Sequence, residues 1–160
     1  MNTLLQAGAR VQQAFERRSW RFCFIGGIAN FRWGTPRLTN DLDLTLLTGF
    51  GGEQAYVEEL LAEFESRIRD AATFAATNRV LLLRTCSAED LIVHKAFAGR
   101  PQDWVDIEGV ILKQRGQLAW PQIAAALRDL ADLKGDYDLL GELERTAMRA
   151  EATIGPFLRG

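Results

Sequence analysis

The chain has 160 residues and a formal net charge of −2, with 48% hydrophobic and 25% charged residues. These values are those of an ordinary soluble domain with enough apolar material for one sizeable core. The charge balance argues against a protein that simply coats nucleic acid, because such domains usually carry a strong basic excess. It leaves room for a small nucleotide, or for an RNA end held in a local basic pocket.

Two further features of the composition indicate a cytoplasmic protein. The sequence has no apolar run of about 18 residues, and its first residues lack the pattern of a signal peptide. Cys23 and Cys86 lie in different contexts and have no metal-ligand spacing. We therefore expect reduced thiols and a cytoplasmic location.

The first quarter of the chain alternates helical and extended patterns. A helical apolar stripe covers residues 3–18, and an aromatic and branched run over residues 20–25 predicts a strand. Gly26 and Gly27 end that strand. A short helix is expected over residues 28–33.

The middle of the chain begins with leucines that alternate with aspartate and threonine. This period of two predicts a second strand over residues 41–47, followed by a helix over residues 53–72. A third, buried strand is expected over residues 79–84. Ser87 is a candidate N-cap for a helix that runs to Ala98.

Helices dominate the rest of the chain, over residues 102–114, 121–133 and 136–150. Strands that come first and helices that come later are typical of the α+β class, with a helical C-terminal half. We expect a core over residues 1–100 with the helices of 101–160 packed on it, in a single compact domain.

The residues with the clearest chemistry lie at the ends of the first two predicted strands. Gly26 and Gly27 let the backbone turn tightly against a ligand, and a following helix N-terminus favours an anion such as phosphate. Asp41 and Asp43 would share one face of a strand, where like charges repel unless a divalent cation joins them. The plainer alternatives are glycines that only end a strand, and an edge strand whose outer face is wet.

Together these motifs resemble the DNA polymerase β-like nucleotidyltransferase superfamily. The segment Pro36-Arg-Leu-Thr-Asn-Asp-Leu-Asp-Leu44 is similar to the AbiEii-type toxin nucleotidyltransferases and their uncharacterised relatives. A second block, Ala88-Glu-Asp-Leu-Ile-Val-His-Lys95, resembles the helix of that family that carries a lysine. The resemblance spans about residues 20–110 and implies a nucleotidyltransferase fold with a short mixed sheet flanked by helices.

The resemblance implies roles for the matching residues. Asp41 and Asp43 would be catalytic and would bind Mg²⁺ or Mn²⁺ beside the nucleotide phosphates. Gly26 and Gly27 would cradle the β- and γ-phosphates, and Lys95 would be catalytic and would reach the triphosphate. The plainer alternative for Lys95 is a solvated helix residue.

Other charged residues have looser assignments. Arg37 and Thr39 would position phosphate or nucleotide, although Arg37 could equally be a surface loop residue. Arg100, Asp103 and Asp106 match an arginine and a spaced aspartate pair of the family. A helix-capping or intrahelical charge network explains these three residues at least as well as catalysis does.

The family pattern usually includes a third carboxylate on a later strand, and the predicted strand over residues 79–84 has no acid. Asp103 or Asp106 could replace it. The missing acidic strand would also leave an exposed sheet edge, so we expect a homo-oligomer formed through that edge.

Two functions follow from these observations. The first is a metal-dependent transfer of a nucleoside monophosphate from a nucleoside triphosphate to a hydroxyl of RNA, such as tRNA, or of a protein, as in toxin families. The second is a catalytically degenerate nucleotidyltransferase fold that binds nucleotide or another protein. A purely structural adaptor is a third possibility. A hydrolase triad built on the single histidine, His94, is disfavoured because no serine or cysteine nucleophile accompanies it.

Overall fold

The computed structural model describes residues 2–68 and 83–154. The elements of this part follow in the order α1 (Asn2–Arg17), β1 (Phe22–Phe24), α2 (Gly26–Trp33), β2 (Leu44–Leu46), α3 (Glu53–Ile68), α4 (Ala88–Ala98), α5 (Pro101–Gln114), α6 (Trp120–Lys134) and α7 (Leu139–Ile154). The helices predicted from the sequence are all present over the described residues. The predicted residues 69–72 of the third helix and 79–82 of the third strand lie outside them.

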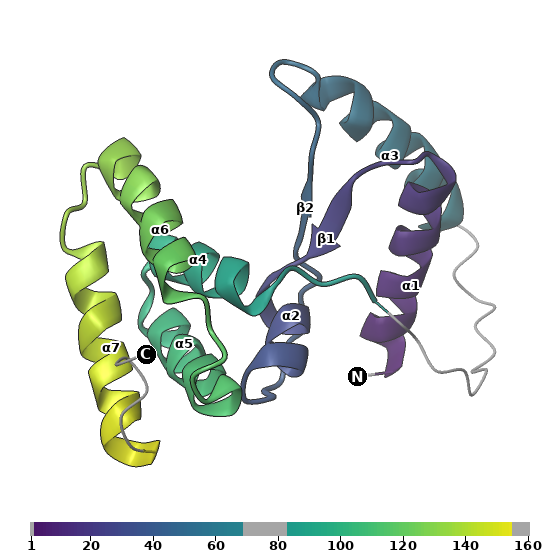
Figure 1. Ribbon diagram of the computed structural model, residues 1–160. Helices are drawn as coiled ribbons and strands as arrows, with labels where there is room; N and C mark the ends of the chain where they lie inside the picture. The colour runs from purple at the N-terminus through teal and green to yellow at the C-terminus, as the bar shows by residue number, and fades with distance from the viewer. Residues whose placement is uncertain (1, 69–82, 155–160) are drawn as a thin grey trace.

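The sheet of the described residues is short, with two antiparallel strands and one isolated parallel bridge beside them. β1 and β2 pair antiparallel, with Phe22 opposite Leu46 and Phe24 opposite Leu44. On the other side of β1, Thr85 forms a parallel bridge to Phe24. The α+β class, with a short sheet flanked by helices and a helical C-terminal half, is therefore confirmed (Figure 1).

The predicted second strand is longer than the observed one. Sequence alternation indicated residues 41–47, whereas β2 covers only Leu44–Leu46. The reason is that β1 ends at Phe24 and α2 begins at Gly26, so few residues remain to pair with the earlier segment. One further hydrogen bond, 3.0 Å from Ile25 N to Asp43 O, continues the pairing beyond the strand. Side chains still alternate, with Asp41 and Asp43 exposed on either side of a half-buried Leu42.

The apolar side chains form two clusters. The smaller one joins Ala14 and Phe15 of α1 to the strand residues Phe22 and Phe24, and Ile28 of α2 completes it. The larger cluster joins α4, α5, α6 and α7. Figure 1 shows the same division, with α1, α3 and the strands on one side, α4 to α7 on the other, and α2 between them.

Helix α2 connects these two clusters. Ile28 belongs to the smaller cluster and its neighbour Ala29 to the larger one. α2 packs against both α4 and α5. The N-terminus of α2, and with it the glycine turn, therefore lies where the sheet meets the helical half.

The helix that carries Lys95 is defined at both ends by its sequence. Ser87 has extended backbone angles, and its hydroxyl accepts a hydrogen bond of 3.0 Å from Asp90 N, as an N-cap does. Gly99 ends the helix in the left-handed conformation, with φ of 68°. Along the described residues, none of the helices combines the length and the apolar character that crossing a membrane requires.

Candidate active site

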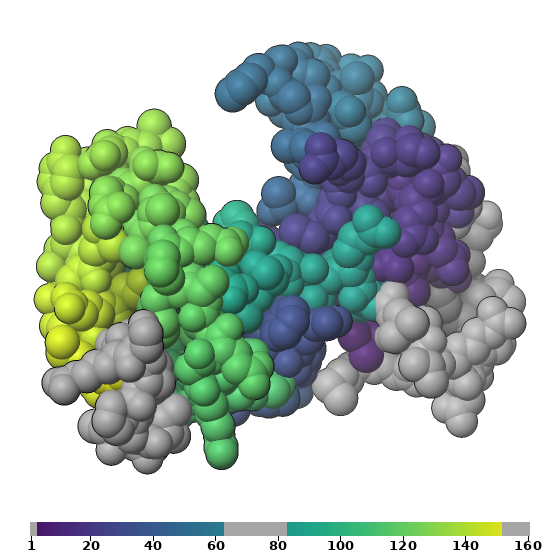
Figure 2. Space-filling view, in the orientation of Figure 1, coloured from purple at the N-terminus to yellow at the C-terminus, as the bar shows by residue number. Residues whose placement is uncertain are grey.

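A pocket of about 420 Å³ opens where the sheet meets α4 and α5. It collects the residues predicted from the sequence, which lie in three separate segments of the chain. These are Gly26, Gly27, Arg37, Thr39, Asp41, Asp43 and Lys95. Figure 2 shows that this face of the molecule is hollowed between its helical half and the side that carries the strands. The structure thus brings the predicted residues together, and their roles remain predictions.

The glycine turn is held close to the segment before β2. Gly26 has a φ of 57°, which other residues rarely adopt, and a Cβ there would lie 2.9 Å from Asp43 Cβ. A Cβ on Gly27 would lie 2.6 Å from Thr39 Oγ1. Both positions therefore require glycine, and Asp43 and Thr39 lie against the N-terminal turn of α2.

Asp41 and Asp43 present carboxylates that are in no ion pair within the described residues. Both residues are exposed and line the pocket. Among the described residues, neither side chain takes part in a hydrogen bond or an ion pair. Thr39 bonds only the backbone of Asp41, through its hydroxyl at 3.4 Å. Two neighbouring free carboxylates are a donor set that suits a hard divalent cation such as Mg²⁺.

Opposite these acids, Lys95 is buried between two aspartates. Its Nζ lies 3.1 Å from Asp103 Oδ1 and 2.6 Å from Asp106 Oδ2. Only 5% of the residue is exposed. The solvated helix lysine considered from the sequence is therefore wrong for Lys95, because the charge is buried and paired.

Each of the two aspartates also binds an arginine. Arg37 Nε donates to Asp106 Oδ1 at 3.0 Å, and Arg100 Nε donates to Asp103 Oδ2 at 2.7 Å. Burial tends to raise the pKa of both carboxyl groups, but the hydrogen bonds from the arginines and Lys95 outweigh it and hold each pKa below its ordinary value. Both carboxylates are consequently ionised at neutral pH.

Because of these contacts, neither Asp103 nor Asp106 provides a third free carboxylate. Both are fixed in ion pairs, and Asp103 also accepts a hydrogen bond from Arg100 N, which caps α5. Over residues 2–68 and 83–154, no group of three or more acids, histidines or cysteines is placed to hold a metal. The charge network expected for Arg100, Asp103 and Asp106 is thus present, together with Arg37 and Lys95.

Sequence reasoning gave no site role to His94 and Gln102, which line the same pocket. It left Arg100, which also lines the pocket, open between a charge network and catalysis. His94 is exposed on α4, one residue before Lys95. Gln102 donates a hydrogen bond of 3.2 Å to Asp106. The second block of the resemblance was the available signal for His94 and Arg100, but it did not indicate which of its side chains face the acids.

The cysteines do not supply a nucleophile. Burial, followed by the proximity of Cys23, raises the pKa of Cys86 to about 12. Burial also raises the pKa of Cys23. Since only the thiolate is a good nucleophile, both side chains are unreactive at neutral pH.

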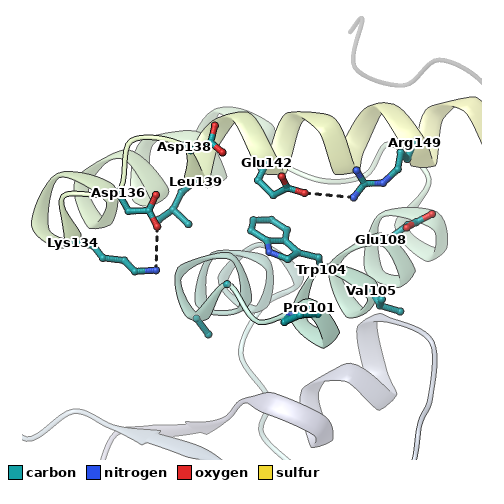
Figure 3. A pocket seen from close by; sticks show the side chains of 12 residues that line it. Pro101, Trp104, Val105, Glu108, Lys134, Asp136, Asp138, Leu139, Glu142 and Arg149 are labelled. Carbon is teal, nitrogen blue, oxygen red and sulfur yellow. Dashed lines mark ion pairs between the residues drawn. The ribbon is translucent and has the colours of Figure 1, made fainter.

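A larger cavity, of about 670 Å³, lies between α5 and α7, and Ala98 at the end of α4 lines both it and the smaller pocket. Figure 3 shows Trp104 near its centre, with an ion pair on each side. Lys134 Nζ lies 3.4 Å from Asp136, and a nitrogen of Arg149 lies 3.8 Å from Glu142. Its acids Asp136, Asp138 and Glu142 are each in an ion pair, so this cavity lacks the neighbouring free carboxylates that Asp41 and Asp43 give the smaller pocket.

The chain matches one known protein family. No curated protein matches the chain. Residues 17–146 match the family described as "Nucleotidyltransferase of unknown function (DUF6036)". The match begins at the end of α1, includes every pocket residue and ends within α7. The chain therefore belongs to this nucleotidyltransferase family.

Proposed function

We propose that this protein transfers a nucleoside monophosphate from a nucleoside triphosphate to an acceptor hydroxyl, with Mg²⁺ or Mn²⁺ held by Asp41 and Asp43. The observation that carries the proposal is the pair of free carboxylates in one pocket, with Asp43 lying against Gly26 and with Arg37, Lys95 and Arg100 lining the same pocket. Membership of a nucleotidyltransferase family supports the reaction class.

In this reaction the acceptor oxygen forms a bond to the α-phosphorus, and the bond from that phosphorus to the β-bridging oxygen breaks. Pyrophosphate leaves, and the hydroxyl proton passes to a base. His94 lines the pocket and is exposed, and histidine is a common proton acceptor near neutral pH. The metal would supply charge neutralisation for the phosphates.

The protein's own part in such a reaction is mainly positioning and electrostatics. The N-terminal turn of α2 presents backbone N–H groups that favour an anion. The close approach of Thr39 to Gly27 fixes the loop that carries Arg37 and Asp41. Positive charge on the α4 and α5 side offsets the charge of the phosphates.

The sequence and its charge favour one kind of acceptor. The resemblance of residues 36–44 to AbiEii-type toxins supports a hydroxyl on tRNA or on a protein, and a toxin role. The net charge of −2 favours an acceptor that binds only at the pocket over one that binds along a long basic face.

A label-transfer experiment tests the reaction. Purified protein is incubated with each α-labelled triphosphate, Mg²⁺ or Mn²⁺, and either total RNA or a cell extract. Transfer that disappears in Asp41→Asn and Asp43→Asn, and persists in the matched surface variant Asp129→Asn, is the expected result. Asp129 is an exposed acid on α6, far from the pocket residues in sequence. Transfer that survives both pocket substitutions would refute the proposal.

One observation favours a second candidate, a non-catalytic module that binds nucleotide or another protein. Within the described part of the chain, the pocket has two free carboxylates, and the nearby Asp103 and Asp106 are both in ion pairs. Such a module would show triphosphate-dependent thermal stabilisation that needs Asp41 and Asp43, without any label transfer.

A further inference from the structure

Five charged side chains form a continuous chain of ion pairs along one wall of the pocket. Arg37 binds Asp106, Asp106 binds Lys95, Lys95 binds Asp103, and Asp103 binds Arg100. The consecutive nitrogen–oxygen distances are 3.0, 2.6, 3.1 and 2.7 Å. Lys95 is the central member, and an arginine lies at each end.

Exposure rises sharply from the middle of this ion-pair chain to its ends. The side chains of Lys95, Asp103 and Asp106 are 6%, 3% and 3% exposed. The side chain of Arg37 is 39% exposed and that of Arg100 is 76% exposed. A ligand in the pocket would therefore meet the two arginines before it could meet the lysine.

The arginines also keep donors for such a ligand. A guanidinium has five N–H donors in a planar fork that matches phosphate oxygens. Arg37 uses Nε and Nη2 on Asp106 and Nη1 on Leu38 O, and Arg100 uses Nε and Nη2 on Asp103. Nη1 of Arg100 has no hydrogen bond within the described residues. Anchoring through Nε leaves Nη hydrogens directed away from the carboxylate.

We infer that Arg37 and Arg100 are the side chains that bind the polyphosphate of the substrate, and that Lys95 is a positioning residue that holds both through Asp106 and Asp103. This inference rests on the proposed function for the substrate class, and it replaces the direct contact between Lys95 and phosphate expected from the sequence. A side chain anchored before binding loses less conformational entropy when the ligand arrives, which favours affinity.

The charges of the pocket agree with this assignment. The ion-pair chain has three cations and two anions, so it carries one excess positive charge, and its exposed ends are both cationic. Asp41 and Asp43 carry the opposite sign and would repel a polyphosphate that arrives without a metal. Polyphosphate binding by the arginines and metal binding by the acids can therefore be separated by measuring polyphosphate affinity with and without a divalent ion.

The test is calorimetric titration of the full chain with inorganic tripolyphosphate, once in EDTA and once in Mg²⁺. Arg37→Gln and Arg100→Gln should each weaken binding about tenfold in EDTA, the effect of losing one charge-assisted contact. Arg128→Gln, which removes the charge of an exposed arginine on α6, should change nothing. Equal affinity for wild type and both pocket variants, or no binding by wild type in either buffer, overturns the inference.

Asp41→Asn separates this result from the proposed reaction. It should leave binding in EDTA intact or tighter, because it removes a repelling charge, and it should abolish the gain that Mg²⁺ gives the wild type. If Asp41→Asn abolishes the Mg²⁺ effect but neither arginine substitution weakens binding, only the binding of polyphosphate by Arg37 and Arg100 is refuted. If the arginine substitutions weaken binding but Mg²⁺ has no effect on the wild type, the arginine assignment is supported and the metal site is refuted.

Double-mutant cycles test the role of Lys95. If Lys95 acts through the arginines, Lys95→Met weakens binding in the wild type but causes no further loss in the Arg37→Gln/Arg100→Gln background. Further loss in that background means direct contact and overturns the positioning role. Asp106→Asn paired with Arg37→Gln repeats the cycle on a milder substitution, with far-UV circular dichroism to confirm folding of each variant.

Discussion

Replacing Lys95 by methionine should destabilise the fold as well as the pocket. The substitution removes two hydrogen bonds between ionised groups, of 3.1 and 2.6 Å, in a site where all three side chains are at most 6% exposed. Charge-assisted bonds contribute about 1.5–3 kcal/mol each, and breaking a buried ion pair costs about 3–5 kcal/mol. Because each aspartate keeps its arginine, we expect the loss of both bonds together to cost about as much as one broken buried pair, about 3–5 kcal/mol.

The loss should depend on pH in a defined direction. In the wild type the pKa of Asp103 and of Asp106 lies below its ordinary value, so their stabilisation is present above about pH 4 and is lost as pH falls further. Removing Lys95 raises both carboxyl pKa values relative to the wild type, since burial is then opposed by one cation fewer. The stability difference is therefore full at pH 7 and shrinks as pH falls through the carboxyl pKa values of the variant.

Urea denaturation followed by tryptophan fluorescence at pH 7, 5 and 4 measures this difference. About 3–5 kcal/mol corresponds to a fall in Tm of about 6–20 °C for a chain of this size. Lys134→Met is the control, because Lys134 forms a half-exposed ion pair of 3.4 Å and an exposed hydrogen bond of 2.9 Å to Phe97 O, and should lose only about 1–2 kcal/mol. A Lys95→Met loss no larger than that of the control, or one that grows as pH falls, would refute the buried ion-pair chain.

Three other predictions concern separate features. Ser87→Ala removes the hydroxyl that caps α4 through Asp90 N and should cost about 1 kcal/mol in urea denaturation, whereas Ser87→Asn should restore most of it. Gly27→Ala places a Cβ 2.6 Å from Thr39 Oγ1, so it should lower the affinity for tripolyphosphate and cost about 1–3 kcal/mol of stability; unchanged affinity in calorimetry would contradict the close approach. We also expect self-association through the β2 side, where Phe50 is fully exposed. A monomeric sedimentation profile at high concentration, or a dimer that Phe50→Asp leaves unchanged, would exclude that interface.

Local signals in the sequence predicted the elements of the pocket well. The glycine pair, the alternation around Leu42 and the Ser87 cap each involve residues that lie within a few positions of one another, and each is present in the structure. The alternation overstated the length of β2, because pairing depends on how much of β1 remains opposite it. A period of two reports which face a side chain occupies and does not report where hydrogen bonding stops.

The contacts of Lys95 were beyond this kind of reasoning. Its partners lie on the next helix, and their approach depends on the angle of the turn through Gly99 between α4 and α5. Arg37 meets Asp106 across 69 residues of sequence. Charged residues in such blocks have the same spacing whether they are solvated, paired or catalytic, so only tertiary packing distinguishes these states.

The pocket depends on how α2, which connects the two apolar clusters, is held against α5. Asp41 and Asp43 are held on the sheet side, where Leu42 and Leu44 pack against the smaller cluster, whereas Lys95 lies among residues of the larger one. Lys113 of α5 donates to Arg32 O at 2.8 Å and to Gly34 O at 3.2 Å, at the C-terminal end of α2. Three residues further along the same loop, Arg37 binds Asp106 of α5. Helix α5 therefore holds residues 32–37, the first part of the segment that leads from the glycine helix to the acids, through polar contacts as well as through the apolar core.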